Sequence, residues 1–272
     1  MNEILKRSIT GFFFISSILL AIYIKIEYSI FIYALFLLMV LLEFYNLFQN
    51  EEKIHFSKWY LFFLSIVSFS VLSLSFIEII DFVYVFLLLP LYLFTFFFAL
   101  WNKSEAPIYS ISIYFIALFY LTIPFSLLVY LTIETNWDNH LLTGMFFMIW
   151  ANDTFAYLGG LAFGKNKLFE KISPKKTWEG ALSGFLFVLI FAGIWGFFID
   201  KENSLAFWLI AALIVSPTAI LGDLFESLIK RSFHVKDSGN ILPGHGGVLD
   251  RFDASLLVIP FFFTWYLIYS SI

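Results

Sequence analysis

An all-α fold that crosses a membrane about nine times is what this sequence predicts. Of its 272 residues, 61% are hydrophobic and only 13% are charged, a balance that soluble globular domains do not show. Apolar runs close to the ~20 residues that a helix needs to cross the hydrocarbon core recur along the whole chain. The chain has no cysteine, which excludes disulfides, thiolate metal sites and thiol nucleophiles.

Each expected helix corresponds to one apolar run. Pro124 lies within the fifth run and predicts a kink, because proline removes a backbone hydrogen bond. No small-residue cleavage site follows the basic start of the first run, so we expect a retained span there and not a cleaved signal peptide. The nine runs are residues 9–24, 29–48, 59–77, 82–101, 108–133, 141–163, 180–199, 205–224 and 252–269.

The basic residues predict a cytoplasmic N-terminus and a C-terminus outside. With nine spans in this orientation, only Lys25 and Lys201 of the 16 lysines and arginines fall on the outer side, while Lys53, Lys103 and the others fall inside, in line with the positive-inside rule. Both large polar loops then face the cytoplasm, where nucleotides are. The short chain, its Phe, Ile and Lys usage and the lack of a transit peptide are compatible with a bacterial plasma membrane.

Polar content divides the chain into two regions. Residues 1–135 hold about five spans whose main polar residue is serine, and we interpret them as a transmembrane scaffold. Residues 136–272 hold about four spans with two basic loops, and we interpret them as the catalytic region. Glu43 is the exception in the scaffold: it could line an internal cavity, but its place near a helix end favours the membrane interface.

Asn152 and Asp153 interrupt the sixth apolar run. An ionised Asp at the centre of a membrane helix costs ~2.5–3.5 kcal/mol on insertion scales, so it usually faces a partner or a wet cavity. Ala156 and Gly160 share a helix face with this pair and would let a second helix approach closely. Two interpretations stay open, a substrate site and a packing face with one hydrogen-bonded carboxylate, of which we favour the first.

The loop from Gly164 to Gly180 is rich in lysine. Such a cluster fixes topology and attracts anionic head groups, which accounts for the charge alone. In the order S-P-K-K-T-W-E-G, however, Lys175 and Lys176 lie next to hydroxyl groups and to a helix that Ser173-Pro174 would cap and start, the combination that binds phosphate oxygens. Both interpretations remain open for this loop.

Polar residues also mark the end of the eighth run and the loop after it. Asp223, Glu226, Ser227 and Lys230 have the spacing of one helix face. The glycines around His245 permit tight turns that present backbone N–H groups to an anion, and Asp250 and Asp253 share a face if a helix begins there. Carboxylate oxygens of this kind suit Mg²⁺.

Residues 227–253, SLIKRSFHVKDSGNILPGHGGVLDRFD, resemble the signature of the phosphatidate cytidylyltransferase (CDP-diacylglycerol synthase) family. The matching residues include Ser227, Lys230-Arg231, Lys236-Asp237, His245-Gly246-Gly247 and Asp250-Arg251-x-Asp253. NDTFAY, SPKKTWEG and GDLFES resemble other segments of the family, in the same order. The resemblance covers about the C-terminal half, and the first five runs agree only in being hydrophobic.

The resemblance implies transfer of CMP from CTP to phosphatidic acid, which gives CDP-diacylglycerol and pyrophosphate. It implies Mg²⁺, with a second cation as an option in a two-metal site, a homodimer and no role for nucleic acid. Asp223, Asp250 and Asp253 are the implied metal ligands and, with His245, the implied catalytic residues. The implied substrate-binding residues are Asn152, Asp153, Ser173, Lys175, Lys176, Thr177, Glu179, Ser227, Lys230, Arg231, Lys236, Asp237, Gly246, Gly247 and Arg251.

His245 is not expected to act as a general base. The attacking phosphate monoester has a second pKa of roughly 6 and is already ionised at neutral pH. We therefore expect His245 to donate a hydrogen bond to a phosphate or to position the glycine loop.

Three other functions remain as alternatives. A CTP-dependent lipid kinase of the polyprenol type would use similar phosphate ligands but release CDP. A CDP-alcohol phosphotransferase would carry a D-G-x-x-A-R motif, which the sequence lacks. A membrane transporter would carry midplane charges in both halves of the chain, whereas here the charges cluster in one half.

Overall fold

The computed structural model describes residues 3–49, 51, 55–101, 105–133 and 140–272. They form two compact units: the first is Met1–Asn136 with Asp237–Asp250, and the second is Trp137–Lys236 with Arg251–Ile272. The described residues are almost entirely helical, which confirms the all-α membrane fold class. The segment 237–250, which holds the glycines and His245, packs with the N-terminal helices.

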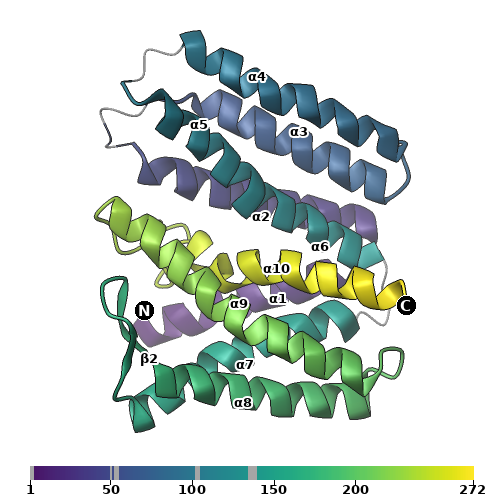
Figure 1. Cartoon of the computed structure of the whole chain (residues 1–272), viewed down its shortest axis with the longest axis vertical. Coiled ribbons are helices and arrows are strands. Elements are labelled where there is room, and N and C mark those ends of the chain that lie inside the picture. Colours follow the sequence, from purple (N-terminus) through teal and green to yellow (C-terminus); the bar gives the residue numbers. More distant parts are fainter. Residues whose placement is uncertain (1–2, 50, 52–54, 102–104, 134–139) are drawn as a thin grey trace. The chain divides into compact units, whose positions relative to one another are not determined.

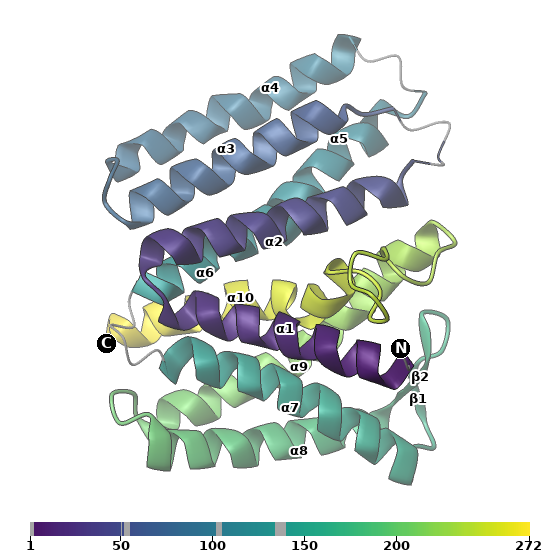
Figure 2. The ribbon, with the colours of Figure 1, turned by 180° about the vertical axis from the view of Figure 1, so that it is seen from behind.

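The first unit is built around α2. This helix packs against α1, α3 and α6, and the buried hydroxyl of Tyr33 on α2 lies 3.1 Å from Thr132 Oγ1 on α6. Figure 2 shows α3 and α4 side by side within this unit. The helical segments are α1 (Glu3–Tyr23), α2 (Ile26–Leu47), α3 (Lys58–Phe76), η1 (Phe82–Leu87), α4 (Leu88–Trp101), α5 (Pro107–Ile116), η2 (Ala117–Thr122) and α6 (Ile123–Ile133).

In the second unit, α7, α8 and α9 pack against one another (Figure 1). Small residues allow the close approach of α7 and α8. A Cβ atom added to Gly180 would lie 2.6 Å from Ala156 O, and one added to Gly184 would lie 2.9 Å from Asn152 O. The predicted close approach at the Asn152–Gly160 face is therefore confirmed. The elements are α7 (His140–Phe163), β1 (Lys167–Phe169), β2 (Ser173–Thr177), α8 (Trp178–Ile194), η3 (Trp195–Ile199), α9 (Leu205–Ser232) and α10 (Leu249–Ser270), the last from Arg251 onward.

Among the described residues, seven helical segments are long and apolar enough to span a membrane. Phe82–Phe98 is apolar but shorter. The 24-residue α7 matches the sixth predicted run, but polar residues such as Asn152 and Asp153 interrupt its apolar sequence and it is not among the seven. The nine-span count and the orientation stay predictions. Lys53, Lys103 and the boundary at residues 135 and 136 lie outside the described residues.

One local expectation was wrong. Ser173-Pro174 does not start a helix, because Ser173–Thr177 forms a strand that pairs antiparallel with Lys167–Phe169. The helix begins at Trp178, where the Thr177 side chain caps it by accepting a hydrogen bond from Gly180 N. A π-helical turn, Ala117–Thr122, precedes Ile123 and Pro124, and the kink expected at Pro124 stays a prediction.

Candidate active site

Three acidic side chains of the second unit come together from three helices. Asp153 on α7, Asp223 on α9 and Asp253 on α10 lie within electrostatic range of one another. Gly222 explains the close approach of α9 and α10 at this point, because a Cβ atom there would lie 2.7 Å from Asp253 O. Carboxylates that the sequence separates by as many as a hundred residues are thus neighbours.

Two lysines form ion pairs with acidic side chains of α9. Lys176 Nζ lies 2.5 Å from Asp223 Oδ2, and Lys230 Nζ lies 2.5 Å from Glu226 Oε2. Glu226 is only 1% exposed, so its pairing offsets a large desolvation cost. The predicted polar face of α9 is confirmed, since the helix continues to Ser232 and Ser227 Oγ donates to Asp223 Oδ1 at 3.3 Å.

The β1–β2 hairpin carries Lys176 to Asp223. Glu179 stabilises the base of the hairpin, because its carboxylate accepts hydrogen bonds from Lys165 N at 3.0 Å and from Asn166 Nδ2 at 2.7 Å. Ser173 is half-buried, whereas Lys175 is exposed. Glu179 therefore shapes the basic loop, and direct contact between Glu179 and a substrate stays a prediction.

Asn152 and Asp153 point to different surroundings. Asn152 is buried and its Oδ1 accepts a hydrogen bond from Ser216 Oγ at 2.6 Å, which ties α7 to α9. Asp153 is exposed on the surface of the helix. The hydrogen bond from Ser216 is what the packing interpretation predicts for Asn152. Asp153 is accessible, as a residue that contacts substrate must be. Their contact with substrate stays a prediction.

Asp250 organises the glycine-rich segment 237–250 of the first unit. Its carboxylate accepts hydrogen bonds from Ser238 N at 3.1 Å and from Gly247 N at 2.9 Å. Between these residues, Leu242 N donates to Gly246 O at 3.0 Å. Gly246 has a φ of +83°, a conformation that other residues rarely adopt. The sequence correctly predicted tight turns here.

Glu43 lies against the same segment, which corrects its predicted place at the membrane interface. Its side chain is 1% exposed. Val248 N donates to Oε1 at 2.9 Å, Leu249 N donates to Oε2 at 2.7 Å, and Ser238 Oγ lies 3.3 Å from Oε2. Buried backbone N–H groups donate hydrogen bonds to its carboxylate, and no sequence pattern identifies such donors. The available signal was a single carboxylate within an otherwise apolar run.

Helix α1 also contacts the segment 237–250. Thr10 Oγ1 lies 2.9 Å from Pro243 O, and Gly11 faces the His245 imidazole so closely that a Cβ atom would lie 3.3 Å from Nε2. The remaining predicted cations lie near the ends of helices. Arg231 Nη1 donates to Val235 O at 2.9 Å, and Arg231, Lys236, Asp237 and Arg251 are exposed.

The donor chemistry of the acidic cluster suits a divalent cation. Within the described parts of the chain, no group of three or more His, Cys, Asp or Glu side chains is arranged to hold a metal ion. Asp153, Asp223 and Asp253 nevertheless offer hard oxygen donors of the type that Mg²⁺ prefers, and a cation would relieve their mutual repulsion. The residues fit Mg²⁺ by chemistry, and the metal itself stays a prediction.

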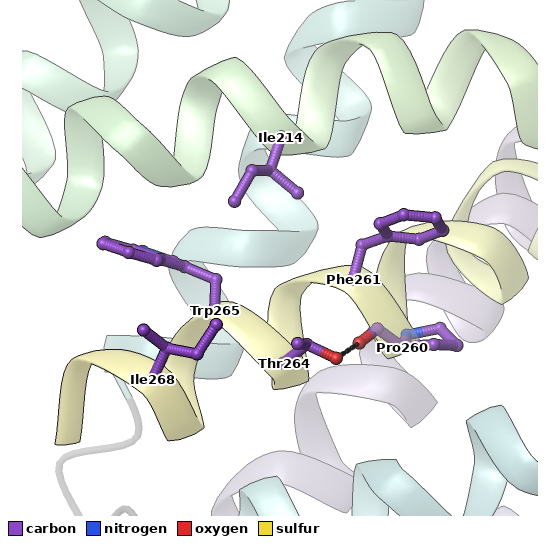
Figure 3. A pocket seen from close by; sticks show the side chains of 6 residues that line it. All are labelled: Ile214, Pro260, Phe261, Thr264, Trp265 and Ile268. Carbon is purple, nitrogen blue, oxygen red and sulfur yellow. Dashed lines mark hydrogen bonds between the residues drawn. The ribbon is translucent and has the colours of Figure 1, made fainter. Parts of the chain in front are cut away.

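An apolar pocket of about 400 Å³ lies between α9 and α10 in the second unit (Figure 3). Ile214 lines it from α9, and Phe261 and Trp265 line it from α10. Thr264 turns its hydroxyl onto Pro260 O at 2.8 Å and so presents no free donor there. The lining is thus apolar, as expected for protein surface near lipid tails.

Comparison with known proteins agrees with the resemblance seen in the sequence. The phosphatidate cytidylyltransferase of Rickettsia bellii is 42% identical over 161 residues, which cover 57% of this chain and 69% of that protein. The enzyme of that name from Bacillus subtilis is 45% identical over 131 residues, 47% of this chain and 49% of that protein. The aligned region thus spans about two thirds of the first relative and half of the second. The family model described as the cytidylyltransferase family matches residues 5–269, and the chain therefore belongs to the cytidylyltransferase family.

Proposed function

We propose that this protein is a CTP:phosphatidate cytidylyltransferase, which transfers CMP from CTP to phosphatidic acid and forms CDP-diacylglycerol and pyrophosphate. The observation that carries the proposal is the pairing of Lys176 with Asp223 beside Asp153 and Asp253. Such a cluster offers both cations for phosphate oxygens and carboxylates for a metal. The bacterial relatives are named phosphatidate cytidylyltransferases, which supports the same pair of substrates.

In this reaction a phosphate oxygen of the lipid attacks the α-phosphorus of CTP. One P–O bond forms there, and the bond to the bridging oxygen of pyrophosphate breaks. The lipid phosphate is a monoester with a second pKa of roughly 6, so it attacks as an ionised group without a general base. Negative charge gathers on the leaving pyrophosphate, and stabilising that charge is the main task of the protein.

The proposed metal is Mg²⁺, which when bound supplies Lewis-acid stabilisation of the phosphoryl oxygens. Asp223 and Asp250 are its proposed first ligands, with Asp253 and Asp153 next. Lys176 and Lys230, which pair with Asp223 and Glu226 in this structure, would exchange those carboxylates for substrate phosphates. The proposed further phosphate contacts are Lys175, Arg231, Lys236 and Arg251.

The decisive assay supplies the purified protein with phosphatidic acid, CTP and Mg²⁺. We expect CDP-diacylglycerol and pyrophosphate, identified by mass spectrometry and by a pyrophosphate-coupled assay. Release of CDP together with a phosphorylated lipid would instead identify a CTP-dependent lipid kinase. Formation of neither product pair with all three components present would refute both enzymatic functions.

His245→Gln tests whether a proton transfer limits the reaction. Because the attacking phosphate needs no base, we expect the variant to retain activity and the wild-type pH–rate profile to be flat through the histidine range. The measurement is kcat against pH for both proteins. A variant that is inactive at every pH while it still binds metal and both substrates would contradict this role.

We further propose a homodimer in a bacterial plasma membrane with the site facing the cytoplasm. The absence of cysteine makes single-cysteine labelling direct. In intact cells, Lys201→Cys should react with a membrane-impermeant maleimide, whereas Lys165→Cys should react only after the cells are opened. Labelling of Lys165→Cys in intact cells would show that the orientation is the opposite of the one proposed.

A further inference from the structure

We propose that Glu43 is a positioning residue, which fixes the glycine-rich segment 237–250 and thereby sets the place of Asp250. The proposal rests on the proposed function, in which Asp250 binds the metal. Glu43 belongs to α2, in the part of the chain where the sequence motifs of the site are absent. Its role is to hold other groups in place, without contact to the substrate.

The contacts of Glu43 join the two ends of the segment. Ser238, near the start, points its hydroxyl at Oε2, 3.3 Å away. Val248 and Leu249, at the end, donate their N–H groups to Oε1 and Oε2 at 2.9 and 2.7 Å. A single buried carboxylate therefore closes the segment into a loop and accepts N–H groups at the N-terminus of α10.

The loop also encloses the carboxylate sterically. A Cβ atom on Gly239 would lie 2.7 Å from Glu43 Oε1, and one on Gly247 would lie 2.6 Å from Oε2. Both distances are shorter than real Cβ contacts, so a side chain at either position would displace the carboxylate or the loop. Close contact with Glu43 thus gives a physical reason for glycine at two positions of the loop.

Ser238 connects Glu43 to Asp250. Its hydroxyl faces Glu43, while its backbone N–H donates to Asp250 Oδ1 and Oδ2 at 3.2 and 3.1 Å. Gly247 also serves both carboxylates, since it packs on Glu43 and donates its N–H to Asp250 at 2.9 Å. A shift of the Glu43 carboxylate would move two of the groups that orient Asp250.

The test compares Glu43→Gln with Glu27→Gln, an exposed glutamate of the same helix. Gln keeps the size of the side chain. Its NH₂ group, however, would face a backbone N–H group that in the wild type donates to a carboxylate oxygen of Glu43. We expect amide exchange at Val248 and Leu249 to rise at least about 10-fold in Glu43→Gln, and Mn²⁺ affinity to fall about 10- to 100-fold, as for other residues that support a metal ligand. Glu27→Gln should change neither.

Hydrogen–deuterium exchange and electron paramagnetic resonance of Mn²⁺ measure these two effects without turnover. They remain informative if the wild type fails to make CDP-diacylglycerol, which would refute the proposed function by itself. Unchanged amide exchange in Glu43→Gln would overturn the proposal. Increased exchange with unchanged Mn²⁺ affinity would also overturn it, because Glu43 would then stabilise the loop without positioning Asp250.

Ser238→Ala provides a second variant if Glu43→Gln is not recovered folded. It removes only the hydroxyl that faces Glu43 and leaves the backbone N–H that Asp250 accepts. We expect a smaller change in the same direction, with Mn²⁺ affinity reduced about 3-fold or more, within the lower range for a supporting hydrogen bond. Wild-type Mn²⁺ affinity in Ser238→Ala would count against the connection between the two carboxylates.

Discussion

Asp223→Asn is expected to lower the rate of CMP transfer at least about 100-fold and to leave the protein folded. Asn has the same shape but no charge, so it weakens metal binding and removes the partner of Lys176. The Lys176–Asp223 pair is partly exposed, and its loss costs at most about 1 kcal/mol of stability. The measurements are pyrophosphate release and thermal unfolding in detergent.

Glu202→Gln is the matched control for this substitution. Glu202 is an exposed carboxylate of the same unit, in the turn before α9. Its neutralisation should leave turnover near the wild-type value. Near-normal activity in both Asp223→Asn and Asp250→Asn would mean that the metal is held elsewhere. Asp250→Asn alone is less specific, because it also weakens the hydrogen bonds from Ser238 and Gly247.

Gly180→Ala is expected to destabilise the second unit by about 1–3 kcal/mol, the usual cost of overpacking a close contact. The new methyl group would lie 2.6 Å from Ala156 O and 3.1 Å from the Cα atom of Gly160. Both are backbone atoms and cannot rotate away, so α7 and α8 would have to separate. Thermal unfolding in detergent measures the loss.

Gly193→Ala is the control: it makes the same substitution on α8 at a position that has no close contact with α7. A Cβ atom on Gly193 would meet no heavy atom within 4 Å, and alanine is the better helix former. This variant should therefore be at least as stable as the wild type. Equal melting temperatures for Gly180→Ala and Gly193→Ala would contradict the close packing of α7 and α8.

Hydrophobicity and spacing were sufficient to predict most helices. The run at 141–163 corresponds to His140–Phe163, and the run at 59–77 to Lys58–Phe76. The eighth run was predicted to end at Leu224, but α9 continues to Ser232. Its last turns carry a polar face, and hydropathy alone does not identify polar turns as part of a membrane helix. The hairpin before α8 was missed, since its pairing depends on Lys167–Phe169 and not on the local order around Pro174.

The candidate site was predictable where its chemistry is local. The spacing of Asp223, Ser227 and Lys230 gave the polar face of α9, and the glycines around His245 gave the turns. Partners that come from distant sequence were not predictable. Neither the pairing of Lys176 with Asp223 nor the burial of Glu43 follows from spacing, because each depends on tertiary contacts between segments far apart in the chain.

The contacts of Glu43 also constrain how the protein is made. Its hydrogen-bond partners follow it by 195 to 206 residues, so at about 5–20 residues per second the ribosome supplies them roughly 10–40 s after α2 has left it. During that interval the membrane-insertion machinery handles an apolar helix with a carboxylate near its end and none of its final donors. The first unit is therefore completed only after residue 250 of 272 has been synthesised, and its assembly is a late event of biogenesis although most of its residues are made first.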